Sequence, residues 1–300
     1  MRLKRWLIGL AVFSAFLLAA KVLLLDTAAD PDAPFVIDLK ALHQAATQGG
    51  GPLPTSIEVE KIADFAFPRT MVVAGDGFKM HPMVLLAHRV MWPDHSLIID
   101  TAFSPKDGED MPGSKFDESA YARLQKAMLK TQSIVFTHEH PDHVGGVASA
   151  PNFPAIVGHV IMTREQFNGP KLDREKFAPG TLEQLKLLDY SGLHAVAPGV
   201  VLQKAPGHTP GTQLIYVELA DGKRYLFVGD IAWTEDNIRL ERGRPGLAGT
   251  PLMKEDRAAV AAELQALNAL PKDVHVVVAH DATALERDLK AGLFKQGFSD

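Results

Sequence analysis

The sequence predicts an α/β fold, and three features carry this prediction. Short β-rich runs alternate along the chain with stretches of helical spacing. The β-rich runs lie early and late with helices between them, an order that fits two sheets sandwiched by helices and also other α/β layouts. The 300 residues are 46% apolar with a net charge of -5, which is the composition of a globular chain that can bury a sizeable core.

The β-rich runs are bounded by turn residues and are predicted to be strands. They cover residues 83–92, 96–100, 133–136, 155–162, 199–205, 213–219, 224–229 and 274–279. An Asp-Gly turn within residues 220–223 predicts a hairpin between its two flanking strands. Helical spacing predicts one helix after Asp117, which would be its N-cap, and a second helix within residues 253–267.

Residues 1–29 are predicted to be a membrane anchor or a signal segment. Three basic residues precede an apolar stretch, residues 6–25, that is interrupted only by Lys21. As a helix this stretch would span a bilayer with its basic end in the cytoplasm. Alternatively, residues 6–20 are the core of a signal peptide that is cleaved near Ala28–Ala29. We prefer the anchored form to the secreted form. Either form predicts that the rest of the chain lies in the cell envelope, on the periplasmic side.

Residues 30–55 are predicted to be a linker, because proline and glycine breakers surround a brief helical patch near residues 38–46. The rest of the chain, residues 56–300, is then expected to form one domain. Neither an internal repeat nor a second linker divides this span.

The composition excludes several function classes. The chain contains no cysteine, so it has no disulfide, and any metal must be bound by histidine and carboxylate side chains. A mildly acidic chain without a long Lys/Arg block is not expected to bind nucleic acid. A small-molecule substrate is therefore expected, and the sequence leaves the oligomeric state open.

A dense group of metal-binding residue types follows the run at 133–136, within "FTHEHPDHVGG". The group consists of His138, His140, Asp142 and His143. The first two can aim at one metal, while the last two begin the next segment and can face a second metal. Imidazole and carboxylate without thiolate suit Zn²⁺, and also Fe or Mn. Gly145 and Gly146 permit close approach of another backbone segment.

Three further candidates follow apolar runs: His208 in "APGHTPGTQ", Asp230 in "LFVGDIAW" and His280 in "VVVAHDATAL". Each residue alone is more often a core or turn residue than a ligand. Their shared placement at carboxyl ends of strands favours a common site. The seven residues are enough for two metals with open positions for water.

In this order, the motifs "THEHPDHVGG", "PGHTPG", "VGD" and "AHD" resemble the metallo-β-lactamase superfamily over about residues 57–285. The resemblance implies an αββα sandwich that binds two metals. In this chain the sandwich would follow the N-terminal transmembrane or signal helix. It implies a first metal on His138, His140 and His208, and a second on Asp142, His143 and His280, with Asp230 bridging both. A strand that ends at Asp100 also resembles the family, and this carboxylate is expected to orient a ligand histidine.

Finer detail resembles the N-acyl-homoserine lactonase branch. There the bridging aspartate is followed by the pattern Asp-x-x-Tyr-Thr-x-x-Asn, and the corresponding stretch here is "DIAWTEDN", residues 230–237. Trp233 replaces the tyrosine, and an indole can donate a hydrogen bond but cannot shuttle a proton. Trp233 is therefore expected to contact a substrate chain or to be a core aromatic.

Several alternatives remain open. Glyoxalase-II-like thioesterases share the seven ligands but bind anionic glutathione through basic residues in an added carboxyl-terminal helical region. The β-lactamase branches lack the bridging aspartate, and one of them requires a cysteine that this chain lacks. Charge and compartment disfavour a tRNA-processing nuclease. A catalytically silent, metal-binding envelope module is a different class, and the complete ligand set argues against it.

The predicted reaction is hydrolysis of an ester-like bond, a lactone in the preferred interpretation, by a hydroxide that bridges two zinc ions. Asp142 is the catalytic candidate that moves the proton to the leaving oxygen, because every motif histidine is a predicted ligand. Lys79 and Arg242 could contact a substrate carboxylate or lie on the solvated surface.

Overall fold

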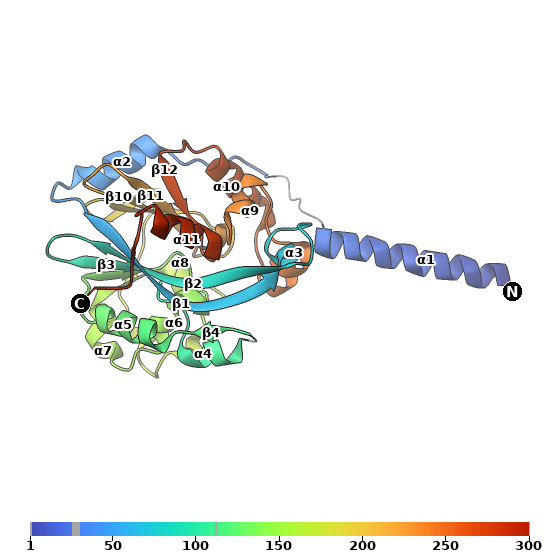
Figure 1. Cartoon of the computed structure of the whole chain (residues 1–300), viewed down its shortest axis with the longest axis horizontal. Coiled ribbons are helices and arrows are strands. Elements are labelled where there is room, and N and C mark those ends of the chain that lie inside the picture. Colours follow the sequence, from blue (N-terminus) through green and yellow to red (C-terminus); the bar gives the residue numbers. More distant parts are fainter. Residues whose placement is uncertain (1, 26–30, 112, 300) are drawn as a thin grey trace.

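Two β-sheets pack face to face in the computed structural model, which describes residues 2–25, 31–111 and 113–299 (Figure 1). The first sheet has the order β13-β1-β2-β3-β5-β6-β7, with β4 also paired to β1. Its strands are β1 (Ser56–Pro68), β2 (Met80–Met91), β3 (Ser96–Ile99), β4 (Lys115–Phe116), β5 (Ser133–Val135), β6 (Val160–Thr163), β7 (Leu187–Leu188) and β13 (Lys295–Gln296).

The second sheet has the order β12-β11-β10-β9-β8. Its strands are β8 (Leu193–Ala197), β9 (Val200–Lys204), β10 (Gln213–Glu218), β11 (Arg224–Phe227) and β12 (Val274–Val277). The predicted hairpin is confirmed, because β10 and β11 pair antiparallel. Strands β11 and β12 pair parallel, which brings their carboxyl ends to the same edge of the sheet.

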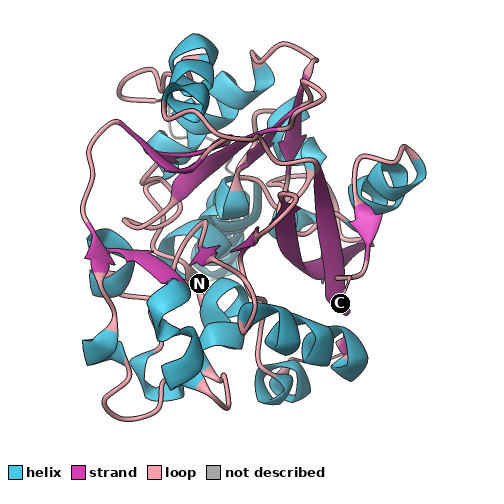
Figure 2. Cartoon of the chain, turned by 90° about the vertical axis from the view of Figure 1, so that its left-hand side faces the viewer, coloured by secondary structure: helices cyan, strands magenta, loops and turns pink. Residues whose placement is uncertain are grey.

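Helices cover the outer face of each sheet, as Figure 2 shows. The first sheet is covered by α4 (Pro105–Asp110), α5 (Glu118–Met128), α6 (Pro141–Ala148), α7 (Phe153–Ile156) and α8 (Arg164–Asn168). The helices near the second sheet are α2 (Leu39–Gln48), α9 (Glu235–Arg239), α10 (Arg257–Asn268) and α11 (Ala282–Lys290), and α3 (Arg69–Val72) follows β1. The remaining helical turns are 3₁₀ turns at Val157–His159, Arg174–Lys176, Leu182–Gln184 and Gly229–Ile231, and π turns at Lys21–Leu25 and Ala248–Leu252.

Three apolar clusters hold these layers together. One joins the first sheet to α5 and α6, for example Ile98 with Leu124. The second lies between the two sheets. The third joins the second sheet to α2 and α10, for example Tyr216 with Leu264. This is the order helix, sheet, sheet, helix, so the expected αββα sandwich is confirmed.

Each predicted strand run contains an observed strand, with one partial error. Within the run 155–162 the strand begins only at Val160, because residues 153–156 form α7 with Pro154 in its first turn. Strand β1 was not predicted, since Glu58 and Glu60 interrupt its apolar pattern. Both carboxylates are buried and receive hydrogen bonds from arginines.

The predicted N-terminal membrane span is not supported. No helix among the described residues is long and apolar enough to cross a membrane. The predicted stretch ran to Leu25, but the regular helix α1 (Arg2–Ala20) ends five residues earlier, where the π turn begins. The predicted cleavage point at Ala28–Ala29 lies outside the described residues.

The predicted linker contains a helix that packs on the domain. Helix α2 begins after Asp38, whose side chain accepts hydrogen bonds from the backbone N–H groups of Lys40 and Ala41. Its Leu42 and Ala46 are buried in the cluster on the second sheet. The domain boundaries otherwise stay predictions.

Candidate metal centre

The structure brings all seven predicted residues together at one end of the sandwich. His138 and His140 follow β5, and Asp142 and His143 lie in the first turn of α6, which begins at Pro141. The other three follow strands of the second sheet: His208 in the β9–β10 loop, Asp230 after β11 and His280 after β12. The seven residues therefore lie just beyond the carboxyl ends of their strands, at a common edge of the two sheets.

The side chains form two groups that share Asp230. His138, His140, His208 and Asp230 form one group, and Asp142, His143, His280 and Asp230 form the other; within each group the potential ligand atoms lie within 4.8 Å of one another. We call them the first and second groups. Oδ2 of Asp230 lies 3.4 Å from Nε2 of His208, whereas Oδ1 lies 3.0 Å from Nε2 of His280. The two carboxylate oxygens thus face different groups, as a bridging ligand requires.

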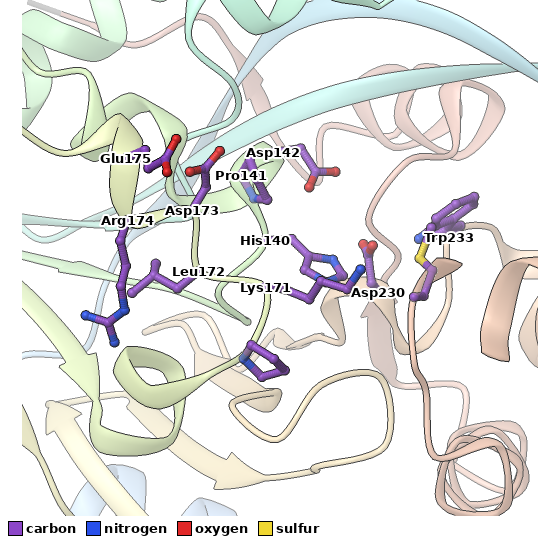
Figure 3. Close-up of a pocket in the computed structure, with 12 residues that line it drawn as sticks. His140, Pro141, Asp142, Lys171, Leu172, Asp173, Arg174, Glu175, Asp230 and Trp233 are labelled. Atoms are coloured by element: carbon purple, nitrogen blue, oxygen red, sulfur yellow. The ribbon is translucent and has the colours of Figure 1, made fainter. Parts of the chain in front are cut away.

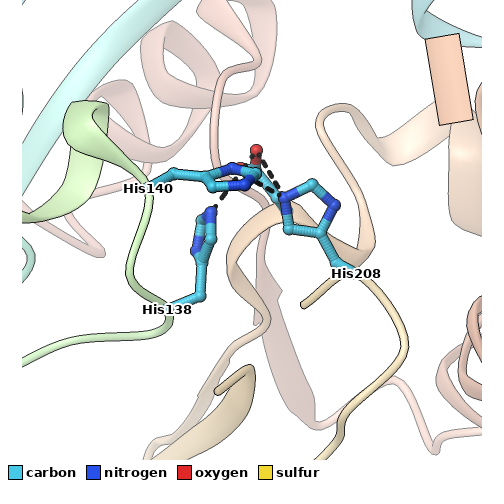
Figure 4. Close-up of side chains that lie close together, drawn as sticks. His138, His140 and His208 are labelled. Atoms are coloured by element: carbon cyan, nitrogen blue, oxygen red, sulfur yellow. Dashed lines mark hydrogen bonds and ion pairs between the residues drawn. The ribbon is translucent and has the colours of Figure 1, made fainter. Parts of the chain in front are cut away.

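The imidazoles of the first group point toward one another, as Figure 4 shows for the three labelled histidines. Nδ1 of His140 lies 3.0 Å from Nε2 of His208. Burial lowers the pKa of His138 well below its usual range and lowers the pKa of His140 to about 2. Both rings are therefore neutral at neutral pH and have a lone pair for a metal.

The second group combines a histidine and carboxylates whose charged forms stabilise one another. Burial alone would lower the pKa of His143, but the carboxylates of Asp100, Asp142 and Asp230 raise it well above its usual range. Burial would likewise raise the pKa of Asp230, yet His280, His143 and His138 hold it well below its usual range. Asp230 is thus anionic and available as a ligand.

Unpaired buried atoms show that this cluster fits metal ions. Within the described residues, Nε2 of His138, Nε2 of His143 and Oδ1 of Asp230 are buried without a hydrogen-bond partner. A buried polar atom without a partner is costly. Nitrogen and oxygen donors at this spacing suit Zn²⁺, and also Fe or Mn.

Neighbouring groups hold the ring nitrogens that face away from the cluster. Nδ1 of His143 lies 2.8 Å from Oδ2 of Asp100, the geometry that the sequence predicted for this carboxylate. Asp100 also accepts hydrogen bonds from the backbone N–H and the hydroxyl of Thr137, both at 2.7 Å. Nδ1 of His280 lies 2.9 Å from the carbonyl oxygen of Val84. These contacts orient the two rings.

Gly229 lets the turn before Asp230 pass close to the first sheet. Its φ is +51°, and a Cβ atom here would lie 2.7 Å from Cβ of Thr137. A larger residue would displace the turn that carries the shared carboxylate.

A cavity of about 670 Å³ opens over the cluster. Its lining includes His140, Asp142, Asp230 and Trp233, together with residues 170–175 and Met253. In Figure 3, the side chain of Lys171 extends toward His140 and Asp230, whereas that of Arg174 points away from them. Arg174 instead lies over the ring of Phe167, 4.4 Å from its centroid.

Trp233 is 7% exposed, lines the cavity and packs in the core, while its contact with a substrate chain stays a prediction. It stacks on Phe67 with the ring centroids 6.1 Å apart, and it meets the ring of His280 edge to face at 5.8 Å. Lys79 and Arg242 are exposed and do not line the cavity.

Sequence reasoning missed three side chains: Lys171 in the cavity, and Glu255 and Arg244 behind His208. Oε1 of Glu255 lies 2.6 Å from Nδ1 of His208, and Arg244 donates a hydrogen bond to the same oxygen. Neither residue stands in a motif, and their contacts join distant segments. The turn-rich stretch "RGRPG", residues 242–246, is a signal that could have indicated the loop of Arg244.

Comparison with known proteins identifies a family and several relatives of this chain. A family model described as the metallo-beta-lactamase superfamily matches residues 92–280. A hydroxyacylglutathione hydrolase of Aeromonas hydrophila is 32% identical over 190 residues, which are 63% of this chain and 58% of that protein. An N-acyl homoserine lactonase of Bacillus cereus is 25% identical over 138 residues, which are 45% of this chain and 53% of that protein. The chain spans little more than half the length of these curated relatives.

Solved structures share the fold. An N-acyl homoserine lactone hydrolase with N-hexanoyl-L-homoserine bound at its catalytic metal center has a TM-score of 0.61 at 19% identity, covering 78% of this chain and 96% of that chain. The dizinc quorum-quenching lactonase AidC has a TM-score of 0.53 at 17% identity, covering 76% and 89%. The family model covers more than half of the residues, and the αββα sandwich agrees with it. This chain therefore belongs to the metallo-β-lactamase superfamily.

Proposed function

We propose that this chain is a two-zinc hydrolase that cleaves an ester-like bond, and that its substrate is a lactone. The observation that carries the proposal is the carboxylate of Asp230, whose two oxygens face two different groups of buried metal-binding side chains. An isolated structural metal would need only one such group.

The residues around the cavity divide the chemical tasks. Bound zinc ions would polarise the substrate carbonyl and lower the pKa of a water molecule. Asp142 lines the cavity with its side chain 22% exposed, so its carboxylate can meet the leaving ring oxygen and carry a proton to it. Trp233, Leu172 and Met253 offer an apolar surface for a substrate chain.

Helix α11 bears on the choice between a lactone and a glutathione thioester. After His280 the described chain forms α11 and the short strand β13, which pairs with β1. Arg287 of α11 is engaged by Glu235 and Asp288, so its charge is already balanced. This guanidinium is therefore not offered to an anionic substrate such as glutathione, which favours a lactone. The names of the lactonase relative and of the lactone hydrolase with bound product agree with this substrate class.

Thioester hydrolysis is the second candidate function. The hydroxyacylglutathione hydrolase matches a larger share of this chain than the lactonase does, 63% against 45%. The cation of Lys171 at the cavity also suits an anionic substrate. A direct comparison of both substrate classes is therefore the deciding measurement.

The test is metal analysis followed by assay of a panel of N-acyl lactones, acyl-glutathione thioesters and β-lactams. We expect two metal ions per chain, zinc in preference to iron or manganese, and the highest kcat/KM with a lactone. Faster thioester cleavage would favour the second candidate. Metal without any turnover would favour a silent binding module, and a chain without metal would overturn both enzymatic proposals.

Two histidine variants make the assay specific. His208→Ala should abolish turnover while the far-UV circular dichroism spectrum stays unchanged, because His208 belongs to the first group. His43→Ala is the matched control, since His43 lies on α2, where it contacts Glu218. Retained turnover in His208→Ala would contradict the mechanism.

We also propose that the N-terminal segment directs the hydrolase domain to the periplasmic side of the cell envelope. The basic start and the exposed apolar side chains of α1, such as Trp6 and Phe16, agree with export. Cell fractionation with mass spectrometry of the N-terminus tests this proposal. A cleaved N-terminus in the periplasmic fraction would indicate a signal peptide. An intact N-terminus in the membrane fraction would indicate an anchor. Recovery of the protein from the cytosol would contradict export.

A further inference from the structure

A buried carboxylate outside the seven-residue cluster contacts His208. Nδ1 of His208 lies 2.6 Å from Oε1 of Glu255, which follows 47 residues later in the chain. The side chains are 0% and 1% exposed. Because Nε2 of His208 faces Asp230 at 3.4 Å, one ring nitrogen faces the cluster while the carboxylate holds the other. A histidine ligand held in this way has a fixed tautomer and ring orientation.

Arg244 holds the same carboxylate and also reaches the shared aspartate. Its Nε donates to Oε1 of Glu255 at 2.6 Å, and its Nη2 donates to the main-chain carbonyl of Asp230 at 2.7 Å. Nη2 also lies 3.2 Å from Nδ1 of His208. When Nδ1 carries the proton that it donates to Glu255, it cannot accept another, so this contact is not a hydrogen bond.

The arginine further supports the cavity wall. Its guanidinium carbon lies 4.9 Å from the ring centroid of Trp233, and its side chain is 0% exposed. One buried cation thus contacts the carboxylate behind His208, the backbone of Asp230 and an aromatic ring of the cavity. This set of contacts is more than is needed to neutralise Glu255.

The second group contains a parallel arrangement. Asp100 holds Nδ1 of His143 at 2.8 Å, as Glu255 holds Nδ1 of His208 in the first group. Each group therefore has one histidine backed by a carboxylate. A carboxylate in this position raises the basicity of the ligand as well as orienting it.

We propose that Glu255 and Arg244 form a positioning pair for the metal of the first group, in which Glu255 orients His208 and Arg244 fixes both Glu255 and the backbone of Asp230. The inference deepens the proposed function and rests on its metal centre. Neither side chain touches the reacting atoms, so the expected effect is on metal affinity before it is on chemistry.

The test measures zinc affinity of the full chain by competition with a chromophoric chelator. Glu255→Gln should weaken binding of one zinc ion by roughly 10- to 100-fold and leave the other within about threefold. The matched control is Glu58→Gln, because Glu58 and Arg89 form another buried pair, with both side chains 6% exposed. Glu58 contacts Arg89 and Ser299 rather than the cluster, so its variant should bind both ions like the unmodified chain.

A second variant keeps the test interpretable if Glu255→Gln does not fold. Arg244→Met combined with Glu255→Gln removes both buried charges, so no unpaired ion remains in the interior. This double variant should fold, as judged by its urea unfolding transition, and should still lose affinity for one zinc ion. The corresponding control is Arg89→Met with Glu58→Gln.

The outcomes separate the inference from the function on which it rests. Unchanged affinity for both ions in a folded Glu255 variant would overturn the positioning pair while leaving the metal centre intact. Equal losses in the Glu255 and Glu58 variants would also overturn it, because they would reflect general destabilisation. Absence of zinc binding in the unmodified chain would instead overturn the proposed function.

Discussion

His88 shows, at the scale of one residue, how a histidine near the cluster serves the fold instead. It lies on β2 and is 6% exposed, and its ring meets Phe227 and Phe294 edge to face at 4.9 and 5.4 Å. Its Nε2 is buried without a hydrogen-bond partner among the described residues. Burial lowers the pKa of His88 to about 4, so the ring stays neutral.

This pKa predicts acid destabilisation. Between pH 6.5 and pH 4 the unfolded histidine, with a pKa of about 6.5, binds more protons than folded His88. The contribution of His88 to the free energy of unfolding is therefore fully present above pH 6.5 and is lost as the pH falls toward 4. We expect the unmodified chain to lose about 2–3 kcal/mol more than His88→Leu between pH 7.5 and pH 4.5. Urea unfolding with chelator at both pH values measures this difference, and equal losses would contradict it.

Trp233 carries a prediction about substrate preference. If its ring packs against a substrate chain, Trp233→Leu should lower kcat/KM for a long-chain acyl lactone about tenfold more than for a short-chain one, because part of the apolar contact is lost. The ratio of the two substrates cancels any general loss of active enzyme. Phe78→Leu is the control, since Phe78 is 71% exposed and does not line the cavity. An unchanged ratio would assign Trp233 to packing alone.

At the scale of elements, α6 depends on the close backbone approach that Gly145 and Gly146 were expected to permit. A Cβ atom on Gly146 would lie 2.4 Å from the carbonyl oxygen of Thr101. The same segment is tied to α6 by a hydrogen bond from the backbone N–H of Thr101 to the carbonyl of His143 at 2.7 Å. The contact therefore sets the position of the turn that carries Asp142 and His143.

Gly146→Ala should consequently destabilise the chain by about 1–3 kcal/mol, because either α6 or the Thr101 segment must move. The control is Gly158→Ala, since a Cβ atom at Gly158 would have no neighbour within 4 Å. Urea denaturation of both variants measures the difference. Equal stability of the two variants would show that the helix can shift without loss.

At the scale of the whole molecule, the cluster lies at one edge of a sandwich whose three apolar cores contain none of its seven side chains. Removing metal should leave the fold intact, because the apolar cores remain packed. It should lower Tm by several degrees, since a ligand that binds only the native state stabilises by about 2.7 kcal/mol at a hundredfold excess over Kd. Thermal unfolding with and without chelator measures the shift, and readdition of zinc should restore it. Loss of the far-UV signal on chelation would contradict this expectation.

Strands could be predicted from the sequence where the local pattern of apolar residues was unbroken. Most strands were recognisable because their apolar runs are continuous, whereas β1 escaped notice because Glu58 and Glu60 break its pattern. Their burial depends on Arg89 and Arg123, which lie far along the chain. Likewise, the strand at β6 was predicted too early because Pro154 starts a helical turn within an apolar run.

The sequence by itself determined the metal-binding residue types and their order, because each candidate stands in a short motif at the end of a strand. The family resemblance already implied that Asp230 bridges two metals. Tertiary structure alone decided that Lys171 extends toward His140 and Asp230 and that Glu255 and Arg244 stand behind His208. The physical reason is that these relations are distances between segments far apart in sequence. Packing of the two sheets, rather than any local pattern, brings those segments to a common edge.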